Sequence, residues 1–545
     1  MGEPQRIQAR ISPERRRLHE ARGEWPHPNL SEVLARRVAE SPDEVLYVAG
    51  EERVTAPELS HRVARLATGL RRLGVRPGAV VSWQLGNWIE GVVLHFAIDR
   101  LGAVSNPILP IYREREVSFI VGQARSQVLV VPGELRGYDH RALAATVQRE
   151  QPHLEYVLVA RAAPAEGQGS FDALLETPHD PALPASTIGP DDVCGVFYTS
   201  GTTADPKGVM HTPSTLGAFM RTQSSISGDS GRIGLLSFPL THIGGVCAFG
   251  TGPVVNGSRA IFLDPFDPEV GLDLIEREGI TSAGGPTPVL QALLGAKGFS
   301  SERVRSVELA GLGATDVPPE LIREVGEKLG AFVYRAYGMT ECPMATSGRP
   351  DDPEDRRILT DGRAAPGVIA RIADEQGRPV PPGTEGEVEL FGPQLCVGYF
   401  DARLDEGSFT EDGFIRTGDL AVMDEGGYVR ITGRKKDIII RKGENLSAKA
   451  IEDELHEHPS IHEAAVIGVP DAKTGERACA CVVLRPGASP LSLDELRSFM
   501  RGRDVMAQKI PEQIEIVDAL PRNATGKVKK HELRERFGRR AGASA

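Results

Sequence analysis

Helical and strand-like apolar patterns alternate along the first part of the chain. The spacing of apolar residues predicts helices over Leu30–Val38, Ala56–Leu73 and Asn87–Leu101, the last of them amphipathic. Short apolar runs at Val80–Gln84, Val128–Val131 and Val304–Leu309 predict strands. Between Gln151 and Pro190 the composition turns to Ala, Pro, Gly and acidic residues, which predicts a surface excursion. Helix and strand in alternation favour a parallel sheet covered by helices on both faces, so we expect an α/β fold here.

The size and the later sequence predict more than one domain. A chain of 545 residues exceeds what one hydrophobic core usually supports. After Gly367 the pattern changes to short alternating strands with turns, which predicts a β-rich subdomain. From Gly433 onward helices and strands indicate a small α+β unit. We therefore expect a large N-terminal domain over residues 1–432 and a small C-terminal domain over residues 433–545.

The composition excludes several classes of protein. The formal net charge of −12 argues against nucleic acid or an anionic membrane as the main partner. No window approaches the roughly 18 apolar residues of a membrane helix. The first 22 residues lack the apolar core of a secretory signal, and the six cysteines show no paired CxxC spacing. We expect a cytoplasmic protein with reduced thiols.

One polar stretch is the first feature of the sequence that indicates a binding site. Residues Tyr198 to Thr212 read YTSGTTADPKGVMHT and follow an apolar, strand-like segment. Several hydroxyl groups, Gly201 and the cation of Lys207 at the end of a strand are typical of a phosphate site. The spacing is not that of a Walker A loop, because the lysine precedes its glycine and Val209 follows. The alternative for this stretch alone is a polar turn between two strands.

Four further blocks place this stretch in a known context. They are Tyr337–Glu341 (YGMTE), Thr417–Asp419 (TGD), Gly433–Asp437 (GRKKD) and Pro521–Lys527 (PRNATGK). With the Tyr198 run, and in this order, they resemble the signatures of the adenylate-forming superfamily of acyl-CoA synthetases, luciferases and peptide-synthetase adenylation domains. The resemblance runs from about residue 30 nearly to the end, and the Gly433 block looks most like fatty-acid and alicyclic-acid CoA ligases.

The resemblance implies a site for ATP and Mg²⁺. The loop and Lys207 would hold the β- and γ-phosphates, Tyr337 would pack on the adenine, Thr340 would contact the α-phosphate and Glu341 would bind Mg²⁺. A single glutamate suffices for Mg²⁺ when phosphate oxygens and water complete its coordination. Asp419 would bind the ribose hydroxyls. The implied ATP-binding residues are Thr199, Ser200, Gly201, Thr202, Thr203, Lys207, Gly313, Ala314, Tyr337, Gly338, Met339, Thr340, Asp419, Ile431, Arg434 and Lys527.

The resemblance also assigns the catalytic and mobile parts. Lys527 matches the catalytic lysine of the adenylation step, in which it would act with Thr340 and Glu341. Lys436 matches the hinge about which the small domain rotates before the thioester step. His242, Gly244 and Gly313 would border the acyl pocket, although His242 in a turn is equally well explained as a satisfied polar group. Lys442 and Gly443 would line the tunnel for CoA.

The expected activity is that of an ATP-dependent acid:CoA ligase. Such an enzyme activates a fatty, aromatic or alicyclic acid as acyl-AMP, releases pyrophosphate and transfers the acyl group to CoA. The chain ends shortly after Lys527, so we expect no fused carrier domain. One alternative is a stand-alone enzyme that loads a separate carrier protein, and another is a catalytically silent nucleotide-binding regulator. A homodimer is compatible with either.

Overall fold

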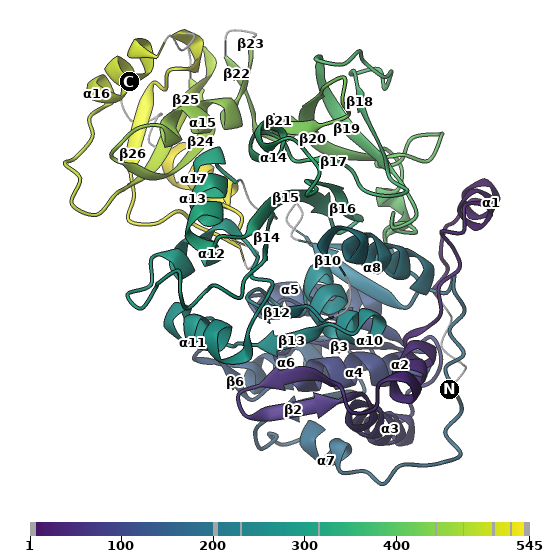
Figure 1. Cartoon of the computed structure of the whole chain (residues 1–545). Helices are drawn as coiled ribbons and strands as arrows, with labels where there is room; N and C mark the ends of the chain where they lie inside the picture. Colours follow the sequence, from purple (N-terminus) through teal and green to yellow (C-terminus); the bar gives the residue numbers. More distant parts are fainter. Residues whose placement is uncertain are drawn as a thin grey trace.

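A computed structural model describes residues 7–199, 205–228, 231–313, 317–441, 444–471, 474–503, 507–523 and 526–538. Figure 1 shows a large lower body with two smaller units above it, a β-rich one and the C-terminal one. The short helix α1 (Pro13–Ala21) lies beside the β-rich unit. Among the described residues, no helix is both long enough and apolar enough to cross a bilayer.

The lower body is built on a seven-stranded sheet that is parallel except at one edge, where β10 and β11 are antiparallel. Alternate residues serve its two faces: Val81 packs with α3 and α4, and Val80 packs with α5 and α6. In spatial order the strands are β11 (Lys207–His211), β10 (Gly195–Thr199), β4 (Val104–Pro107), β3 (Val80–Trp83), β5 (Val128–Pro132), β8 (Tyr156–Ala160) and β9 (Gly169–Ser170). The helices here are α2 (Leu30–Glu40), α3 (Ala56–Arg72), α4 (Ile89–Arg100), α5 (Glu114–Ala124), α6 (His140–Glu150) and α7 (Phe171–Leu175), with the hairpin β6 (Glu134–Leu135) and β7 (Tyr138–Asp139).

A second sheet packs on the other side of α3 and α4. Isolated bridges at Ser282 connect its two halves. Its strands are β12 (Ile233–Leu236), β13 (Arg259–Phe262), β1 (Val45–Ala49) and β2 (Glu52–Thr55), then β14 (Leu309–Gly313), β15 (Phe332–Met339), β16 (Cys342–Ser347) and β17 (Arg363–Ala364). Its helices are α8 (Pro213–Ser227), α9 (Ile243–Gly245), the π-helix Val246–Thr251, α10 (Gly252–Asn256), α11 (Pro268–Glu278), α12 (Thr287–Leu294), α13 (Pro319–Leu329) and α14 (Glu354–Leu359).

The structure confirms the α/β class but corrects three local predictions. Helix α4 is not amphipathic: it lies between two sheets, and its residues are buried all round except at Glu90 and Arg100. Residues 151–190, expected to be a surface excursion, include the sheet strand β8. The strand expected at Val304–Leu309 begins only at Leu309, because Val304 and Val307 reach the core from a turn.

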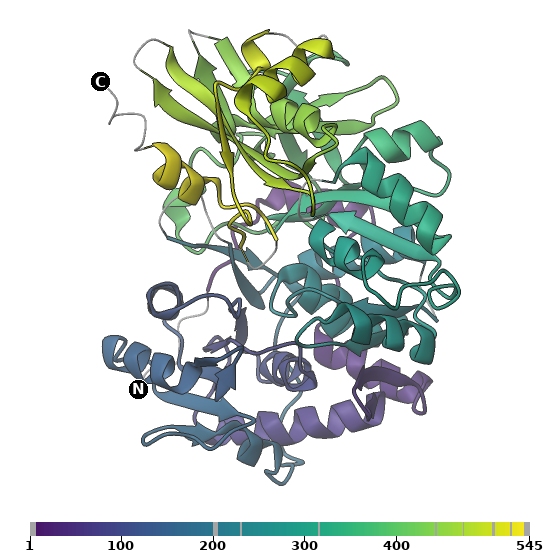
Figure 2. The same ribbon diagram turned by 90° about the vertical axis from the view of Figure 1, so that its left-hand side faces the viewer.

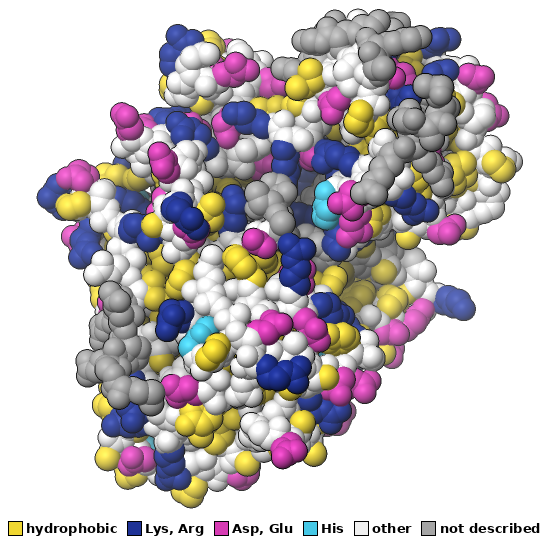
Figure 3. Space-filling view, turned by 180° about the vertical axis from the view of Figure 1, so that it is seen from behind, with side chains coloured by type: hydrophobic (Ala, Val, Ile, Leu, Met, Phe, Trp, Pro, Cys, Tyr) yellow, Lys and Arg dark blue, Asp and Glu magenta, His cyan; other side chains and the backbone are white. Residues whose placement is uncertain are grey.

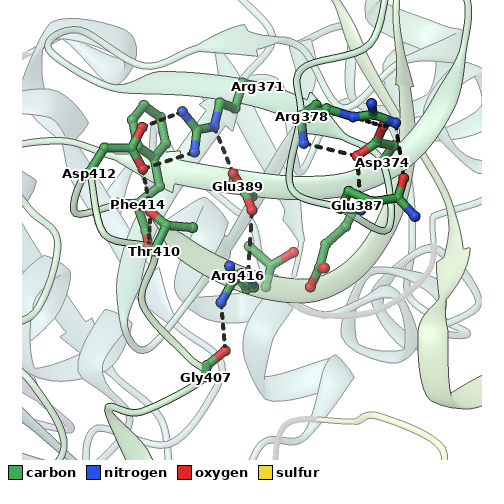
Figure 4. Close-up of polar contacts among 12 residues, drawn as sticks. Arg371, Asp374, Arg378, Glu387, Glu389, Gly407, Thr410, Asp412, Phe414 and Arg416 are labelled. Carbon is green, nitrogen blue, oxygen red and sulfur yellow. Dashed lines mark hydrogen bonds and ion pairs between the residues drawn. The ribbon is translucent and has the colours of Figure 1, made fainter.

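The β-rich unit is an antiparallel sheet of β18 (Ile369–Ala373), β19 (Glu385–Phe391), β20 (Ile415–Met423) and β21 (Val429–Arg434), preceded at β20 by a short 3₁₀ turn at Ala402–Leu404. On one face Glu389, fully buried, lies between Arg371 at 2.7 Å and Arg416 at 3.5 Å, as Figure 4 shows. Two cations around one buried carboxylate leave little uncompensated charge. The network lies in the same sheet as Asp419, which is on the inner strand β20.

The C-terminal unit has its own cores and sits above the large body (Figure 2). It contains β22 (Ile438–Arg441), β23 (Glu444–Ser447), α15 (Ala448–His456), β24 (Ile461–Asp471), β25 (Gly475–Leu484), α16 (Leu493–Gly502), a 3₁₀ turn at Ala507–Lys509, β26 (Gln513–Ile516) and α17 (Lys530–Gly538). A short 3₁₀ turn, Lys435–Asp437, joins it to β21. The predicted division at residue 433 falls just before this turn.

Candidate active site

The hydroxyl-rich stretch connects two antiparallel strands. Thr199 at the end of β10 pairs with Lys207 at the start of β11, which is the edge strand of the seven-stranded sheet. The ammonium of Lys207 lies 5.5 Å from the ring centre of Tyr399. The predicted ligands Ser200, Gly201, Thr202 and Thr203 lie outside the described residues. The two described ends of the loop thus bring one cation and one hydroxyl group to its base.

A second hairpin delivers the next group of predicted residues. Strand β15 carries Tyr337, Gly338 and Met339, and the turn into β16 carries Thr340 and Glu341. Buried His211, at the end of β11, fixes this turn, because its Nε2 donates to the backbone oxygen of Thr340 at 2.8 Å.

Burial lowers the pKa of His211 to about 4, so the ring is neutral. Its Nδ1 therefore accepts from the Thr215 hydroxyl at 3.0 Å. The sequence analysis did not assign a role to His211, and its position at the end of the predicted phosphate motif was the available signal.

Glu341 is a buried carboxylate in a basic setting. Its side chain is 5% exposed, and burial raises its pKa, while the Tyr399 hydroxyl, Lys207 and Lys527 act in the opposite direction. The Tyr399 hydroxyl donates to Glu341 Oε1 at 2.7 Å. Tyr399 was not found from the sequence. The two lysines that act on Glu341 come from different units of the protein, so the carboxylate lies where these units meet.

Asp419 is held by two donors, Tyr337 from β15 of another sheet and Arg434 from the neighbouring strand β21. The hydroxyl of Tyr337 donates to Oδ2 at 2.7 Å, and Nε of Arg434 lies 2.7 Å from Oδ1. Burial and the charge of Asp419 keep the pKa of Tyr337 well above its usual range, so the phenol stays a donor. Ile431 packs beside Tyr337 in the same apolar cluster. The structure thus brings four predicted ATP-binding residues together.

Lys527 reaches this place from the C-terminal unit. It follows Gly526 in a tight turn, where its backbone N–H donates to Asn523 Oδ1 at 2.9 Å. Burial and the nearby cation of Arg434 lower the pKa of Lys527 to about 8, and the carboxylates of Asp419 and Glu341 oppose that shift. Lys527 therefore lies within electrostatic reach of both carboxylates.

One of the predicted acyl-pocket residues, His242, lies within electrostatic reach of the same lysine. Burial and the charge of Lys527 lower the pKa of His242 to about 4. His242 Nδ1 accepts from the backbone N–H of Gly244 at 3.2 Å, and its ring meets Phe238 edge to face. A Cβ on Gly313 would stand 2.6 Å from the Ala336 oxygen, so strand pairing itself requires glycine there. Ala314, Lys442 and Gly443 lie outside the described residues.

The residues on either side of Lys436 are tied to different units. Lys435 Nζ lies 2.8 Å from Glu387 Oε2 on β19, in the N-terminal part. Asp437 Oδ1 lies 2.7 Å from Arg534 Nη2 on α17, in the C-terminal part. Glu387 also accepts from the backbone N–H of Gly418 at 3.0 Å, beside Asp419. Lys436 is therefore the single residue between Lys435, which is tied to the N-terminal part, and Asp437, which is tied to the C-terminal part.

Seen from behind, the molecule is hollowed between its upper and lower parts, and Lys and Arg side chains gather in the hollow (Figure 3). Cations concentrated in a cleft of a chain with net charge −12 favour an anionic ligand there. The AMP-binding enzyme family matches residues 34–400, and the AMP-binding enzyme C-terminal domain matches residues 450–527. The chain belongs to the AMP-binding enzyme family.

Relatives of this AMP-binding enzyme agree along nearly the whole chain. The medium-chain fatty-acid–CoA ligase of Escherichia coli (strain K12) is 33% identical, covering 97% of this chain and 94% of its own. The 2,3-dihydroxybenzoate-AMP ligase of Bacillus subtilis (strain 168) is 30% identical, covering 94% of each.

A solved structure provides a comparison of conformations. ATP-bound MatB from Rhodopseudomonas palustris superposes with a TM-score of 0.85 at 30% identity, covering 94% of this chain and 100% of its own. Apo MatB, with the same coverage, gives 0.74. The arrangement of this AMP-binding enzyme is therefore nearer to the ATP-bound form than to the apo form.

Proposed function

We propose that the protein is an ATP-dependent acid:CoA ligase. It would activate a carboxylic acid as acyl-AMP with release of pyrophosphate, and then form acyl-CoA and AMP. The observation that carries the proposal is the convergence of Lys527 with Glu341 and Asp419, because adenylation brings two anions together and builds charge on phosphorus. A silent nucleotide-binding regulator of this fold would have no need to keep these groups together.

Different described residues would bind different parts of ATP. Thr199 and Lys207, with the loop between them, would hold the β- and γ-phosphates, and Asp419 would accept from the ribose hydroxyls. Glu341 fits Mg²⁺: it is a buried carboxylate, and Mg²⁺ usually takes one or two carboxylates, with phosphate oxygens and water as its other ligands. When bound, the ion would offset phosphate charge. Lys527 would stabilise the charge that develops between the carboxylate and the α-phosphate.

The acid is proposed to be fatty, aromatic or alicyclic. The neutral imidazole of His242, on which the charge of Lys527 acts, forms one wall with the rings of Phe238 and Phe249. The two phenyl rings meet edge to face at 5.6 Å between centroids. An apolar wall with one neutral polar group favours an acid without an amino group. The names of the fatty-acid–CoA and 2,3-dihydroxybenzoate-AMP ligases agree with such acids.

The thioester step requires Lys527 to leave the cleft. We propose that the C-terminal unit turns about Lys436, since Lys435 and Asp437 are tied to different units. CoA is the proposed acceptor. A carrier protein is the second candidate, favoured by the similarity to the 2,3-dihydroxybenzoate-AMP ligase. A cytoplasmic location is proposed from the six free cysteines, whose thiols persist in a reducing compartment. A homodimer stays a prediction.

The test is incubation of the protein with ATP, Mg²⁺, CoA and a panel of acids. We expect AMP, pyrophosphate and an acyl-CoA with at least one fatty or aromatic acid, read by mass spectrometry. Pyrophosphate release without a CoA thioester, together with loading of a phosphopantetheinylated carrier, would select the second candidate. Absence of pyrophosphate release with every acid would contradict the proposal.

The lowered pKa of Lys527 predicts a decline of adenylation at alkaline pH. The cation is the active form, so kcat/KM for ATP should fall about tenfold per pH unit above about 8, where the free enzyme loses this proton. The profile of pyrophosphate release against pH measures this. Lys527→Arg keeps its charge over the whole range and should lack that decline. The same alkaline decline in Lys527→Arg would show that another group titrates.

A further inference from the structure

The segment Leu395–Phe400 holds Glu341 at two points. Cys396 donates its backbone N–H to the Glu341 backbone oxygen at 2.7 Å, and the Tyr399 hydroxyl donates to Glu341 Oε1 at 2.7 Å. Tyr399 is 3% exposed, so water does not replace this hydroxyl when it is removed. The carboxylate is therefore fixed in rotation and position by one short segment.

The same segment is joined to the proposed phosphate loop. Its backbone pairs with β11: the Phe400 N–H donates to the Gly208 oxygen at 2.7 Å, and the Val397 N–H donates to the Met210 oxygen at 3.0 Å. Strand β11 begins at Lys207, whose ammonium lies 5.5 Å from the centre of the Tyr399 ring. Leu395–Phe400 thus connects β11 with Glu341.

On its other side the segment is held by two arginines from the N-terminus. Arg15 donates to the backbone oxygens of Leu395 and Cys396, the latter at 2.9 Å. Arg10 donates from its guanidinium to the Tyr399 oxygen and from its backbone N–H to the Val397 oxygen at 3.0 Å. Three carbonyls of one short segment therefore point at cations that come from residues far away in the chain.

Burying the charged side chain of Arg15 in this position is unfavourable in free energy. Its side chain is 9% exposed, and among the described residues no carboxylate forms an ion pair with it. Burying a cation without a counter-charge carries a large desolvation penalty, which backbone oxygens offset only in part. These arginines also precede residue 34, where the match to the AMP-binding enzyme family begins. The unfavourable burial of Arg15 is explained if its contact with the Leu395–Phe400 segment supports the active site.

We propose that Tyr399, held in place by Arg10 and Arg15 of the N-terminal segment, positions the Glu341 carboxylate for the metal–ATP complex. The proposal rests on the function proposed above, in which Glu341 is the ligand of Mg²⁺. Tyr399, Arg10 and Arg15 act through Glu341 and are positioning residues. The N-terminal segment that carries Arg10 and Arg15 is then part of the active site, although it contacts neither ATP nor the acid.

The test compares ATP binding with and without Mg²⁺, by calorimetry and in the absence of any acid. The wild type should bind ATP more tightly with Mg²⁺ than with EDTA. Tyr399→Phe keeps the ring and removes the hydroxyl, and should lose about tenfold of the affinity for ATP with Mg²⁺ while its affinity in EDTA stays unchanged. Arg15→Met should show the same selective loss, and Arg15→Lys should recover part of it.

The matched control is Tyr428→Phe. Tyr428 also donates to a buried carboxylate, Asp352, at 2.8 Å, but none of the proposed site residues takes part in that contact. In Tyr428→Phe, the gain in ATP affinity on adding Mg²⁺ should equal that of the wild type.

A wild-type Mg²⁺ effect in both Tyr399→Phe and Arg15→Met would overturn the inference and leave the proposed function intact. A wild type without any Mg²⁺ effect would remove Glu341 as a metal ligand and overturn the inference with it. If one variant fails to fold in a thermal melt, the other decides by the same measurement.

Discussion

Lys527→Ala should reduce acid-dependent pyrophosphate release by about 10²- to 10³-fold, the range seen when one group that stabilises a transition state is removed. The affinity for ATP should change little, because the cation acts mainly on charge that develops during the reaction. Direct titration with ATP and a steady-state assay on the same preparation measure the two effects separately.

The second half-reaction provides the contrast. If the C-terminal unit turns about Lys436, Lys527 is away from the adenylate when CoA attacks. Lys527→Ala should therefore convert supplied acyl-AMP and CoA to acyl-CoA at close to the wild-type rate. An equal loss in both half-reactions would contradict the rotation. Lys529→Ala is the matched control, since that nearby lysine pairs with Glu532 at 2.8 Å, and its activity should match the wild type.

Asp419→Asn should weaken ATP binding by about 10- to 100-fold. The change keeps the shape of the side chain but removes the charge that holds Tyr337 and Arg434, and an amide accepts less strongly from the ribose hydroxyls. Hydrogen bonds to charged groups contribute about 1.5–3 kcal/mol each, and the loss of one such contact gives this range. Calorimetry with ATP measures the change directly.

The chain contains an unusually close control for this variant. Asp352 is also 5% exposed and is also held by a tyrosine and an arginine, Tyr428 at 2.8 Å and Arg363 at 2.5 Å. Asp352→Asn should lower the melting temperature by a similar amount and leave the affinity for ATP unchanged. If both variants weakened ATP binding equally, the effect of Asp419→Asn would be structural.

The sequence was sufficient for the fold class and for the blocks that approach one another. Period-two and helical spacing predicted strands such as β3 and helices such as α3, because each has one buried face or a short apolar run. Spacing predicted the helix α4 but wrongly made it amphipathic, because a helix between two sheets is apolar all round and has no polar face. It also failed for β8, whose short apolar run lies within a stretch rich in Ala, Pro and Gly.

The structure brings together residues that the motifs predicted separately, whereas the contacts between distant residues were not predicted. Asp419 and Tyr337 were predicted separately, but their 2.7 Å hydrogen bond joins positions 82 residues apart. Tyr399 and Arg15 give no local signal, because their roles depend on which carbonyl or carboxylate folding brings to them. The predictions for Ser200 to Thr203, Ala314, Lys442 and Gly443 lie outside the described residues and stay predictions.

The central claim is that ATP lies in the cleft between the units, with its triphosphate toward the β10–β11 loop and Lys527. Its most direct test is titration of the wild-type protein with ATP and Mg²⁺ in a calorimeter, followed by the same titration of Asp419→Asn. We expect one ATP per chain and a weaker affinity in the variant. No heat of binding in the wild type, or identical affinities in both proteins, would contradict the claim.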